Sequence, residues 1–312
     1  MKKLLAILTA MLMVFAMLTV FTGCGDEDDD KKKDKKSSKS VSDKAKDDED
    51  DKKKDKDEEE DKGESADFSI EKTVLLDKND IKITATEVKE DWGETEINLL
   101  VENNGKKDVF LDCNALIVNN YMISNYFFCD VSAGKKSNTG LALSSDELEA
   151  AGIKNVGQIE MVFRASDPDT YDEIFVSDMV TLKTSLFDKM DAEPNDEGKE
   201  LYNSKGIKIV AKGITEDDIF GVGLSLYIEN KTGKNVMISC EDLSVNGFMV
   251  TPLFACSLYD QKMTVASVDI LSDELEDNGI KKVKDVELSF SIYDPDTFDT
   301  IAETGALQYS VG

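Results

Sequence analysis

The chain has 312 residues, with 65 Asp and Glu against 37 Lys and Arg, so its formal net charge is −28. A chain this anionic is repelled by phosphate backbones, which excludes nucleic acid as an expected partner. It contains no histidine, so no imidazole is present to act as a base, activate a nucleophile or bind a metal. The length fits two domains.

The amino terminus is typical of an exported protein. Two lysines precede an uncharged, largely apolar run, Leu4–Phe21, and small residues follow it up to Cys24. This pattern predicts a secretory signal peptide, residues 1–23. The apolar run is also about as long as a minimal membrane helix, so an uncleaved helix is the alternative. No basic cluster follows it directly, which favours cleavage.

Residues 20–24 resemble the lipobox of bacterial lipoproteins, with Phe21 at a position where leucine is usual. The resemblance implies cleavage before Cys24 and attachment of diacylglycerol to the Cys24 thiol. It therefore implies a lipid-anchored protein on the extracytoplasmic face of the cell membrane. Stable anchoring of this kind needs two or more acyl chains.

Residues 24–66 contain 19 acidic residues and 13 lysines but no aromatic residue. Such a segment buries too little apolar surface to offset its ordering entropy, so we expect a disordered charged linker. As a flexible coil it would span roughly 35 Å. The linker is nearly balanced in charge, whereas residues 67–312 hold 46 acidic against 22 basic residues, a net charge of −24.

The rest of the chain is an internal duplication. Residues 103–174 align without a gap with residues 230–301 at an offset of 127, and 28 of the 72 positions are identical. We therefore expect one domain over 67–185, a linker over 186–198 and a second domain over 199–312. Pro194, Asn195 and Gly198 support the linker.

Each copy shows mainly strand signals. Apolar and polar residues alternate in runs such as 81–86, 224–229 and 286–293, as expected for strands with one buried face. Turn residues, among them Asn246-Gly247, separate the runs. The segments 145–149 and 272–276, both Ser-Asp-Glu-Leu-Glu, predict one short helix per copy, ended by Gly152 or Gly279.

These signals predict a mainly β fold, with two tandem immunoglobulin-like β-sandwiches that each carry one short helix. The pattern also resembles the tandem immunoglobulin-like domains of uncharacterised bacterial surface lipoproteins. That resemblance covers the whole chain, but its motifs are structural. It implies no known active site.

Four cysteines remain after Cys24, two per copy at equal spacing: Cys113, Cys129, Cys240 and Cys256. An exported protein can keep disulfides, so one bond per domain is one interpretation. Buried free thiols acting as small apolar residues are the other. If residues 246–247 form a two-residue hairpin, Cys240 faces Leu253 rather than Cys256. A longer loop would bring the two cysteines face to face.

Two further motifs are candidate sites. The segments 167–172 and 294–299, Asp-Pro-Asp-Thr-aromatic-Asp, gather carboxylates that suit calcium, although Asp-Pro is also a common turn opener. An aromatic residue and a methionine follow a turn at Tyr121-Met122 and at Phe248-Met249. Exposed, they would form a ligand-contacting patch, and buried, they would pack the sandwich.

We find no phosphate-binding glycine-rich loop and no nucleophile elbow in the sequence. Among 46 acidic residues in the predicted domains, some carboxylate pair is inevitable, so such a pair does not indicate catalysis. We therefore expect a non-enzymatic surface protein without cofactor or metal, which binds, adheres or assembles through an envelope or extracellular protein or glycan. The alternatives are a small-solute or Ca²⁺-binding accessory lipoprotein and a structural spacer.

Overall fold

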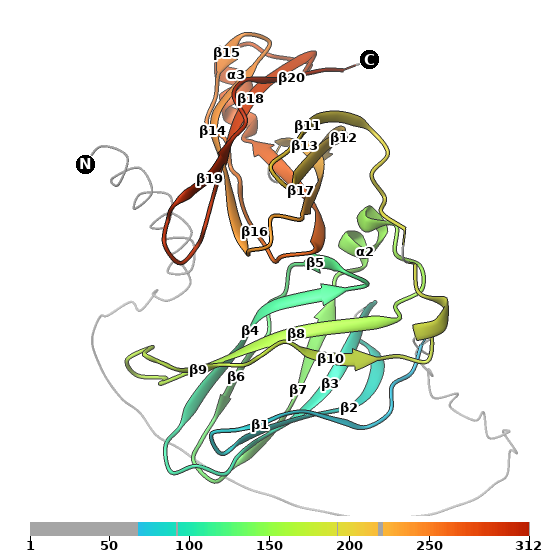
Figure 1. Cartoon of the computed structure of the whole chain (residues 1–312), viewed down its shortest axis with the longest axis vertical. Coiled ribbons are helices and arrows are strands. Elements are labelled where there is room, and N and C mark those ends of the chain that lie inside the picture. The colour runs from blue at the N-terminus through green and yellow to red at the C-terminus, as the bar shows by residue number, and fades with distance from the viewer. Residues whose placement is uncertain (1–67, 92, 192, 218–220, 312) are drawn as a thin grey trace, which may run out of the picture. The chain divides into compact units, whose positions relative to one another are not determined.

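The computed structural model describes residues 68–91, 93–191, 193–217 and 221–311 (Figure 1). The predicted signal peptide, Cys24 and the charged linker lie outside the described residues. Among the described helices, none has the length and apolar character that crossing a membrane requires. The structure is mainly β, as predicted from the alternating runs.

The two copies of the duplication, called repeat 1 and repeat 2 in chain order, are each a sandwich. Repeat 1 has two antiparallel sheets. One sheet has the strand order β1-β2-β3-β7, and the other has the order β10-β8-β4-β5, with β6 paired to β4 and β9 paired to β8. The strands are β1 Thr73–Lys78, β2 Ile81–Asp91, β3 Glu94–Asn103, β4 Val109–Val118, β5 Tyr121–Ile123, β6 Phe128–Val131, β7 Lys136–Leu143, β8 Gln158–Ser166, β9 Glu173–Val176 and β10 Val180–Lys183.

Repeat 2 has the same plan. Its first sheet has the order β11-β12-β13-β17, and its second has the order β15-β14-β18-β19, with β16 paired to β14 and β20 paired to β18. The strands are β11 Lys199–Ser204, β12 Ile207–Asp217, β13 Gly221–Asn230, β14 Val236–Val245, β15 Phe248–Met249, β16 Ala255–Leu258, β17 Lys262–Ile270, β18 Asp285–Tyr293, β19 Thr300–Glu303 and β20 Leu307–Ser310.

Strand alternation builds the core of each repeat. In β3, Ile97, Leu99 and Val101 are at most 1% exposed and point into the sandwich, while the residues between them are only half-buried. Burying side chains of this size contributes roughly 1.5–3 kcal/mol each. Each repeat has its own cluster of buried apolar residues. This confirms the prediction of two immunoglobulin-like sandwiches.

Each repeat carries one short α-helix, α2 Ser145–Ala151 and α3 Ser272–Asp277. Ser144, one residue before the predicted segment 145–149, caps α2, because its hydroxyl accepts a hydrogen bond from the Glu147 N–H. Gly152 ends α2 in the left-handed conformation, at φ 76°, where a residue without Cβ is favoured. A single 3₁₀ turn, η1 Phe187–Lys189, opens the segment between the repeats.

The two repeats also touch each other. Val210, Tyr227 and Met263 of repeat 2 are buried in the apolar cluster of repeat 1. A parallel bridge joins Tyr121 of β5 to Met263 of β17, so the second sheet of repeat 1 and the first sheet of repeat 2 form one continuous ten-stranded sheet. No pattern in the sequence indicates this contact, because it depends on the outer face of a sheet, and alternation assigns the residues of that face to solvent.

Candidate binding surface

An aromatic cluster lies on the outside of the β4–β6 sheet in repeat 1. Because side chains alternate across a strand, Phe110 and Phe128 point away from the core. Their ring centroids lie 6.0 Å apart at an interplanar angle of 24°. Tyr171, from the loop after β8, meets Phe110 edge-on with a centroid distance of 6.3 Å. We call these three residues the aromatic surface.

The aromatic surface is open to solvent. Phe128 is 59% exposed and Tyr171 is 73% exposed. Exposed apolar side chains that gather in one place mark interaction sites more often than isolated ones do. Tyrosine and phenylalanine also supply much contact area with few rotatable bonds.

The loop that carries Tyr171 holds it in a costly conformation. The Asp167 carboxylate accepts hydrogen bonds from the backbone N–H groups of Asp169 and Thr170, at 3.0 and 3.2 Å. The Tyr171 N–H donates to the Asp167 carbonyl at 2.8 Å. This turn places Tyr171 at φ 59°. Left-handed backbone costs a residue with a Cβ about 1–2 kcal/mol, which glycine would avoid.

Repeat 2 repeats this arrangement. The Asp294 carboxylate accepts from the N–H groups of Asp296 and Thr297, at 3.0 and 3.3 Å, and Phe298 has φ 60°. Phe298 is 53% exposed and stacks on Tyr293 at a centroid distance of 6.1 Å. Both copies therefore keep a solvent-exposed aromatic residue where backbone energetics favour glycine. Strained positions of this kind cluster at binding sites.

Charged groups adjoin the aromatic surface. In the strand register, Asp112 lies opposite both Phe128 and Arg164. Arg164 is the only arginine of the chain, and its Nε and Nη2 atoms both donate to Asp112 Oδ2, at 3.0 and 2.9 Å. The rings thus have hydrogen-bonding groups beside them, as a surface that contacts a partly polar partner requires.

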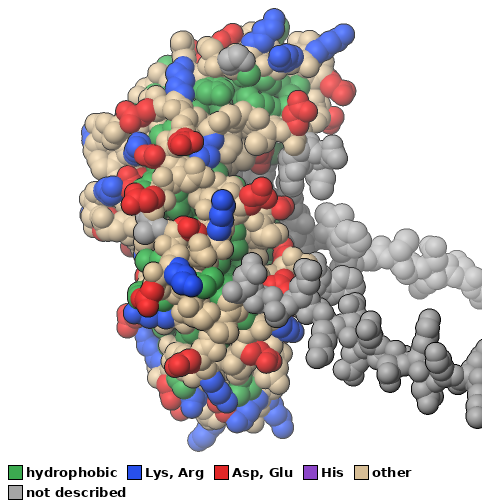
Figure 2. Space-filling model, turned by 90° about the vertical axis from the view of Figure 1, so that its right-hand side faces the viewer, with side chains coloured by type: hydrophobic (Ala, Val, Ile, Leu, Met, Phe, Trp, Pro, Cys, Tyr) green, Lys and Arg blue, Asp and Glu red, His purple; other side chains and the backbone are tan. Residues whose placement is uncertain are grey.

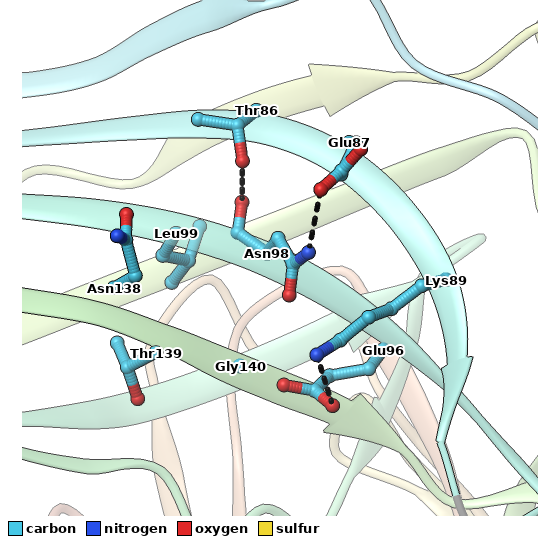
Figure 3. A pocket seen from close by; sticks show the side chains of 9 residues that line it. All are labelled: Thr86, Glu87, Lys89, Glu96, Asn98, Leu99, Asn138, Thr139 and Gly140. Atoms are coloured by element: carbon cyan, nitrogen blue, oxygen red, sulfur yellow. Dashed lines mark hydrogen bonds and ion pairs between the residues drawn. The ribbon is translucent and has the colours of Figure 1, made fainter.

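A separate, polar depression of about 520 Å³ lies over β2, β3 and β7. Its side chains largely pair with one another (Figure 3). Asn98 Nδ2 donates to Glu87 Oε1 at 3.0 Å, and Lys89 Nζ lies 3.7 Å from Glu96 Oε2. Glu96 also extends over Gly140, where a Cβ would collide with it. These groups satisfy each other, so the depression offers a ligand few unpaired partners.

The four cysteines considered for disulfide bonds are free thiols in the structure: Cys113, Cys129, Cys240 and Cys256. Residues 246–247 do form a two-residue turn, with Val245 opposite Phe248. Beyond it the register shifts, and Cys256 lies opposite Ile238 rather than Cys240. In repeat 1, Cys129 likewise lies opposite Leu111. Burial raises the pKa of Cys113, Cys240 and Cys256 to about 12, which makes them poor nucleophiles.

The structure gives the acidic loops a structural task. Asp167 and Asp294 accept backbone hydrogen bonds within their own turns, and Lys234 Nζ lies 2.9 Å from Asp294 Oδ2. Within the described part of the chain, no group of three or more Asp, Glu or Cys residues is arranged to hold a metal ion. In the structure, each loop connects two strands and exposes an aromatic residue, Tyr171 or Phe298.

The aromatic–methionine pairs differ between the repeats. Tyr121 is 2% exposed, whereas Phe248 and Met249 are 48% and 67% exposed. Sequence reasoning singled out these pairs but missed Phe110 and Phe128. The available signal was weak: an aromatic residue at an outward position of a strand, diagonal to another one on the paired strand.

No protein-family model matches the chain, and no curated protein matches its sequence. Several solved structures are distantly similar to it. The YadV chaperone is 13% identical, over 74% of this chain and 100% of that chain, with a TM-score of 0.25. In the complex of the Salmonella enterica SafA pilin with the SafB chaperone, the matched chain is 10% identical over 69% of this chain and 89% of its own, with a TM-score of 0.21.

A protein of unknown function from Porphyromonas gingivalis W83 is 12% identical over 71% of this chain and 90% of its own, with a TM-score of 0.19. TM-scores this low carry no argument about function. The chain is thus defined by its own architecture, a tandem pair of immunoglobulin-like sandwiches, and its function has to be argued from its surface.

Proposed function

We propose that this chain is a lipid-anchored, extracytoplasmic binding protein without catalytic activity. The observation that carries the binding role is the exposed aromatic residue in left-handed backbone, present in both repeats as Tyr171 and Phe298. A purely structural turn would be more stable with glycine there. Its aromatic side chain is better explained by contact with a partner.

The anchor and the location are argued from the sequence. Residues 20–24 carry the lipobox-like segment, and residues 24–66 supply a charged linker that precedes the first described strand. A flexible coil of this length spans roughly 35 Å, enough to hold the sandwiches clear of lipid headgroups. The proposed anchor thus leaves the aromatic surface accessible.

The partner class follows from surface chemistry. Acidic and basic side chains are spread over the face shown in Figure 2, with hydrophobic side chains visible between them. The net charge of −24 on residues 67–312 disfavours anionic polymers as ligands. Aromatic rings beside an ion pair suit a protein or a largely neutral glycan of the envelope or the extracellular space.

The other two functions have less support. A calcium or small-solute accessory would use acidic oxygens, and one oxygen of each turn carboxylate, Asp167 Oδ1 and Asp294 Oδ1, already accepts backbone N–H groups. A pure spacer would not need the exposed rings. Both alternatives leave the conformation of Tyr171 and Phe298 unexplained.

The binding role is tested by retention of envelope components on immobilised residues 67–312. We expect Phe128→Ser combined with Tyr171→Ser to lower retention at least tenfold, about 1.4 kcal/mol. Val74→Ser is the matched control, because Val74 is 52% exposed on β1 in the opposite sheet. Equal retention by all three proteins would contradict the proposal.

The anchor is tested separately, with a clickable fatty acid fed to cells that express the full chain. Labelling should require Cys24, so Cys24→Ala should abolish it and release the protein from membranes. Unchanged labelling of Cys24→Ala would remove the anchor from the proposal. It would leave the binding role intact.

A further inference from the structure

The contact between the two repeats pairs one end of repeat 1 with one sheet edge of repeat 2. The N–H of Met263, in β17, the strand of repeat 2 that adjoins β5, donates to the Asn120 carbonyl at 3.0 Å. The Thr264 hydroxyl donates to the Met122 carbonyl at 3.0 Å. We call the β4–β5 turn of repeat 1, with its neighbour Glu160, the tip. Its counterpart in repeat 2 is the β14–β15 turn with Glu287.

A buried ion pair fixes this contact. Lys262 Nζ lies 2.5 Å from Glu160 Oε2, and each side chain is only 11% exposed. Lys262 also donates to Asn120 Oδ1 at 3.0 Å. A buried pair with this geometry favours one register, because a shifted contact would leave both charges unpaired. The recognition elements are therefore a lysine at the edge, a carboxylate at the tip and apolar packing around them.

The tip of repeat 2 keeps these elements but has no partner of this kind among the described residues. At the 127-residue offset, Phe248 and Met249 replace Tyr121 and Met122, and Glu287 replaces Glu160. Phe248 and Met249 are 48% and 67% exposed. Glu287 is exposed, and its carboxylate accepts a hydrogen bond from Gln308 Nε2 at 2.8 Å. An aromatic residue, a methionine and a carboxylate thus face solvent.

The edge of repeat 1 that corresponds to β17 is also open. Strand β7 ends its sheet and pairs with β3 alone among the described strands. Lys135 stands at the position of Lys262, and Ser137 stands at the position of Thr264 and keeps its hydroxyl. The Lys135 side chain is exposed. Unpaired strand edges readily accept another strand.

The face of repeat 1 next to β7 is more polar than its counterpart. Four apolar residues of repeat 2 lie on this face, and three of them have polar equivalents in repeat 1. Val210, Tyr227, Met263 and Val265 correspond, in this order, to Thr84, Leu100, Lys136 and Asn138. A contact made through this face buries less apolar surface than the internal one. It is therefore weaker, and reversible.

We propose that copies of this chain associate head to tail, the tip of repeat 2 in one copy docking on the β7 edge of repeat 1 in the next. The contact reuses the arrangement between the chain's own repeats, with Glu287 of one copy paired to Lys135 of the other. A second copy is the occupant that offers the complementary lysine and hydroxyl at the same spacing. The proposal goes beyond the binding function proposed above and does not depend on it.

Because the two surfaces differ, the contact is heterologous and does not close on itself at a dimer. Successive copies would form a short linear array. On a membrane, anchored copies are concentrated in two dimensions, so a weak contact can still be occupied. The net charge of −24 per pair of repeats opposes close approach, and salt weakens that long-range repulsion.

Sedimentation equilibrium of residues 25–312, in about 0.15 M salt, tests the proposal. We expect the average mass to rise with protein concentration, with a dissociation constant of roughly 0.1–1 mM, as for a weak contact. Lys135→Glu or Glu287→Lys should each weaken association at least tenfold. The double variant should restore it, because the pair is re-formed with opposite polarity.

Lys189→Glu is the matched control, because it changes the net charge as Lys135→Glu does, at an exposed position in η1, in the segment between the repeats. Circular dichroism confirms that each variant is folded. A monomer at every concentration would overturn the proposal. So would association that neither Lys135→Glu nor Glu287→Lys weakens. So would dimers that survive Lys135→Glu but are lost in Phe248→Ser, since these would form tip to tip.

Discussion

Two tyrosines at the contact between the repeats differ in whether their hydroxyl group has a hydrogen-bond partner. Tyr121 and Tyr227 pack edge-on, with ring centroids 6.4 Å apart. The Tyr121 hydroxyl accepts a hydrogen bond from the Asn195 N–H at 2.7 Å. The Tyr227 hydroxyl is buried, with no hydrogen-bond partner in the described part of the chain. Burial raises the pKa of Tyr227 strongly.

Removing these hydroxyls should have opposite effects on stability. Tyr227→Phe deletes an unsatisfied buried group and should leave the free energy of unfolding unchanged or raise it by about 1 kcal/mol. Tyr121→Phe leaves the Asn195 N–H without its acceptor and should lower it by about 1 kcal/mol. Urea titration measures both. A loss in Tyr227→Phe as large as in Tyr121→Phe would show that the first hydroxyl has a partner.

The raised pKa values of the cysteines lead to a prediction about how fast their thiols are alkylated. With the pKa of Cys113, Cys240 and Cys256 raised to about 12 by burial, little thiolate exists at neutral pH. A pKa three units above the ordinary value lowers the thiolate fraction about a thousandfold at pH 8. Alkylation of folded residues 67–312 should be slower by about that factor than in urea, and should accelerate as the pH rises. Intact mass spectrometry follows it.

The same experiment decides the oxidation state left open by the sequence. Unreduced protein, unfolded in urea before alkylation, should carry four labels if all the thiols are free, as they are in the structure. Two labels or none would show disulfides in one or both repeats. Rapid alkylation of the folded protein at pH 8 would contradict the raised pKa values.

At the scale of elements, the turn after β8 and its equivalent after β18 are held by one carboxylate each. Backbone N–H groups, of Asp169 first, lower the pKa of Asp167. The Lys234 ammonium and then the backbone N–H of Asp296 lower the pKa of Asp294. The hydrogen bonds that lower these pKa values also impose the left-handed backbone at the following aromatic residue.

These lowered pKa values predict a loss of stability in acid. An unfolded aspartate titrates near pH 3.9, so the two carboxylates stabilise the fold above about pH 4, and this contribution is lost as the pH falls through the folded values. Asp167→Asn combined with Asp294→Asn should flatten the decline between about pH 5 and pH 3. Glu149→Gln, on the exposed side of α2, is the control and should decline like the wild type.

At the scale of the whole molecule, the repeats are joined by a mainly apolar contact with one buried ion pair. Lys262 and Glu160 come from different repeats, so their pairing stabilises the docked arrangement rather than either sandwich alone. Asn195, in the segment between the repeats, accepts from Lys212 Nζ through its carbonyl and its side chain, at 2.9 and 3.0 Å. The segment between the repeats is therefore part of the contact between them.

A double-mutant cycle should reveal this pair. Lys262→Met leaves Glu160 buried without its partner and should lower the free energy of unfolding by about 3 kcal/mol, since the pair is largely shielded from water. Lys262→Met combined with Glu160→Met should recover most of that loss, because no charge remains buried. A double variant as unstable as the single one would show that the pair itself is not the source of the effect.

The sequence by itself determined the sandwich class, the duplication and the positions of the short helices. Alternation of residues such as Ile97, Leu99 and Val101 with polar neighbours depends only on the two-residue period of a strand. The Ser-Asp-Glu-Leu-Glu segment and Gly152 are local signals whose meaning does not depend on distant partners. The lipobox-like segment and the charged linker remain predictions from sequence, outside the described residues.

Only the tertiary structure decided which residues on the outer faces of the sheets are buried and which of them contact one another. Val210 and Tyr227 sit at positions that alternation assigns to solvent, yet they are buried by the other repeat. Phe110, Phe128 and Tyr171 lie far apart in sequence and meet because β4, β6 and the β8 loop are neighbours. A pattern along one strand reports which side a residue points to, but not what lies on that side. Contacts between sheets, repeats and copies are long-range, so they emerge only once the chain is folded.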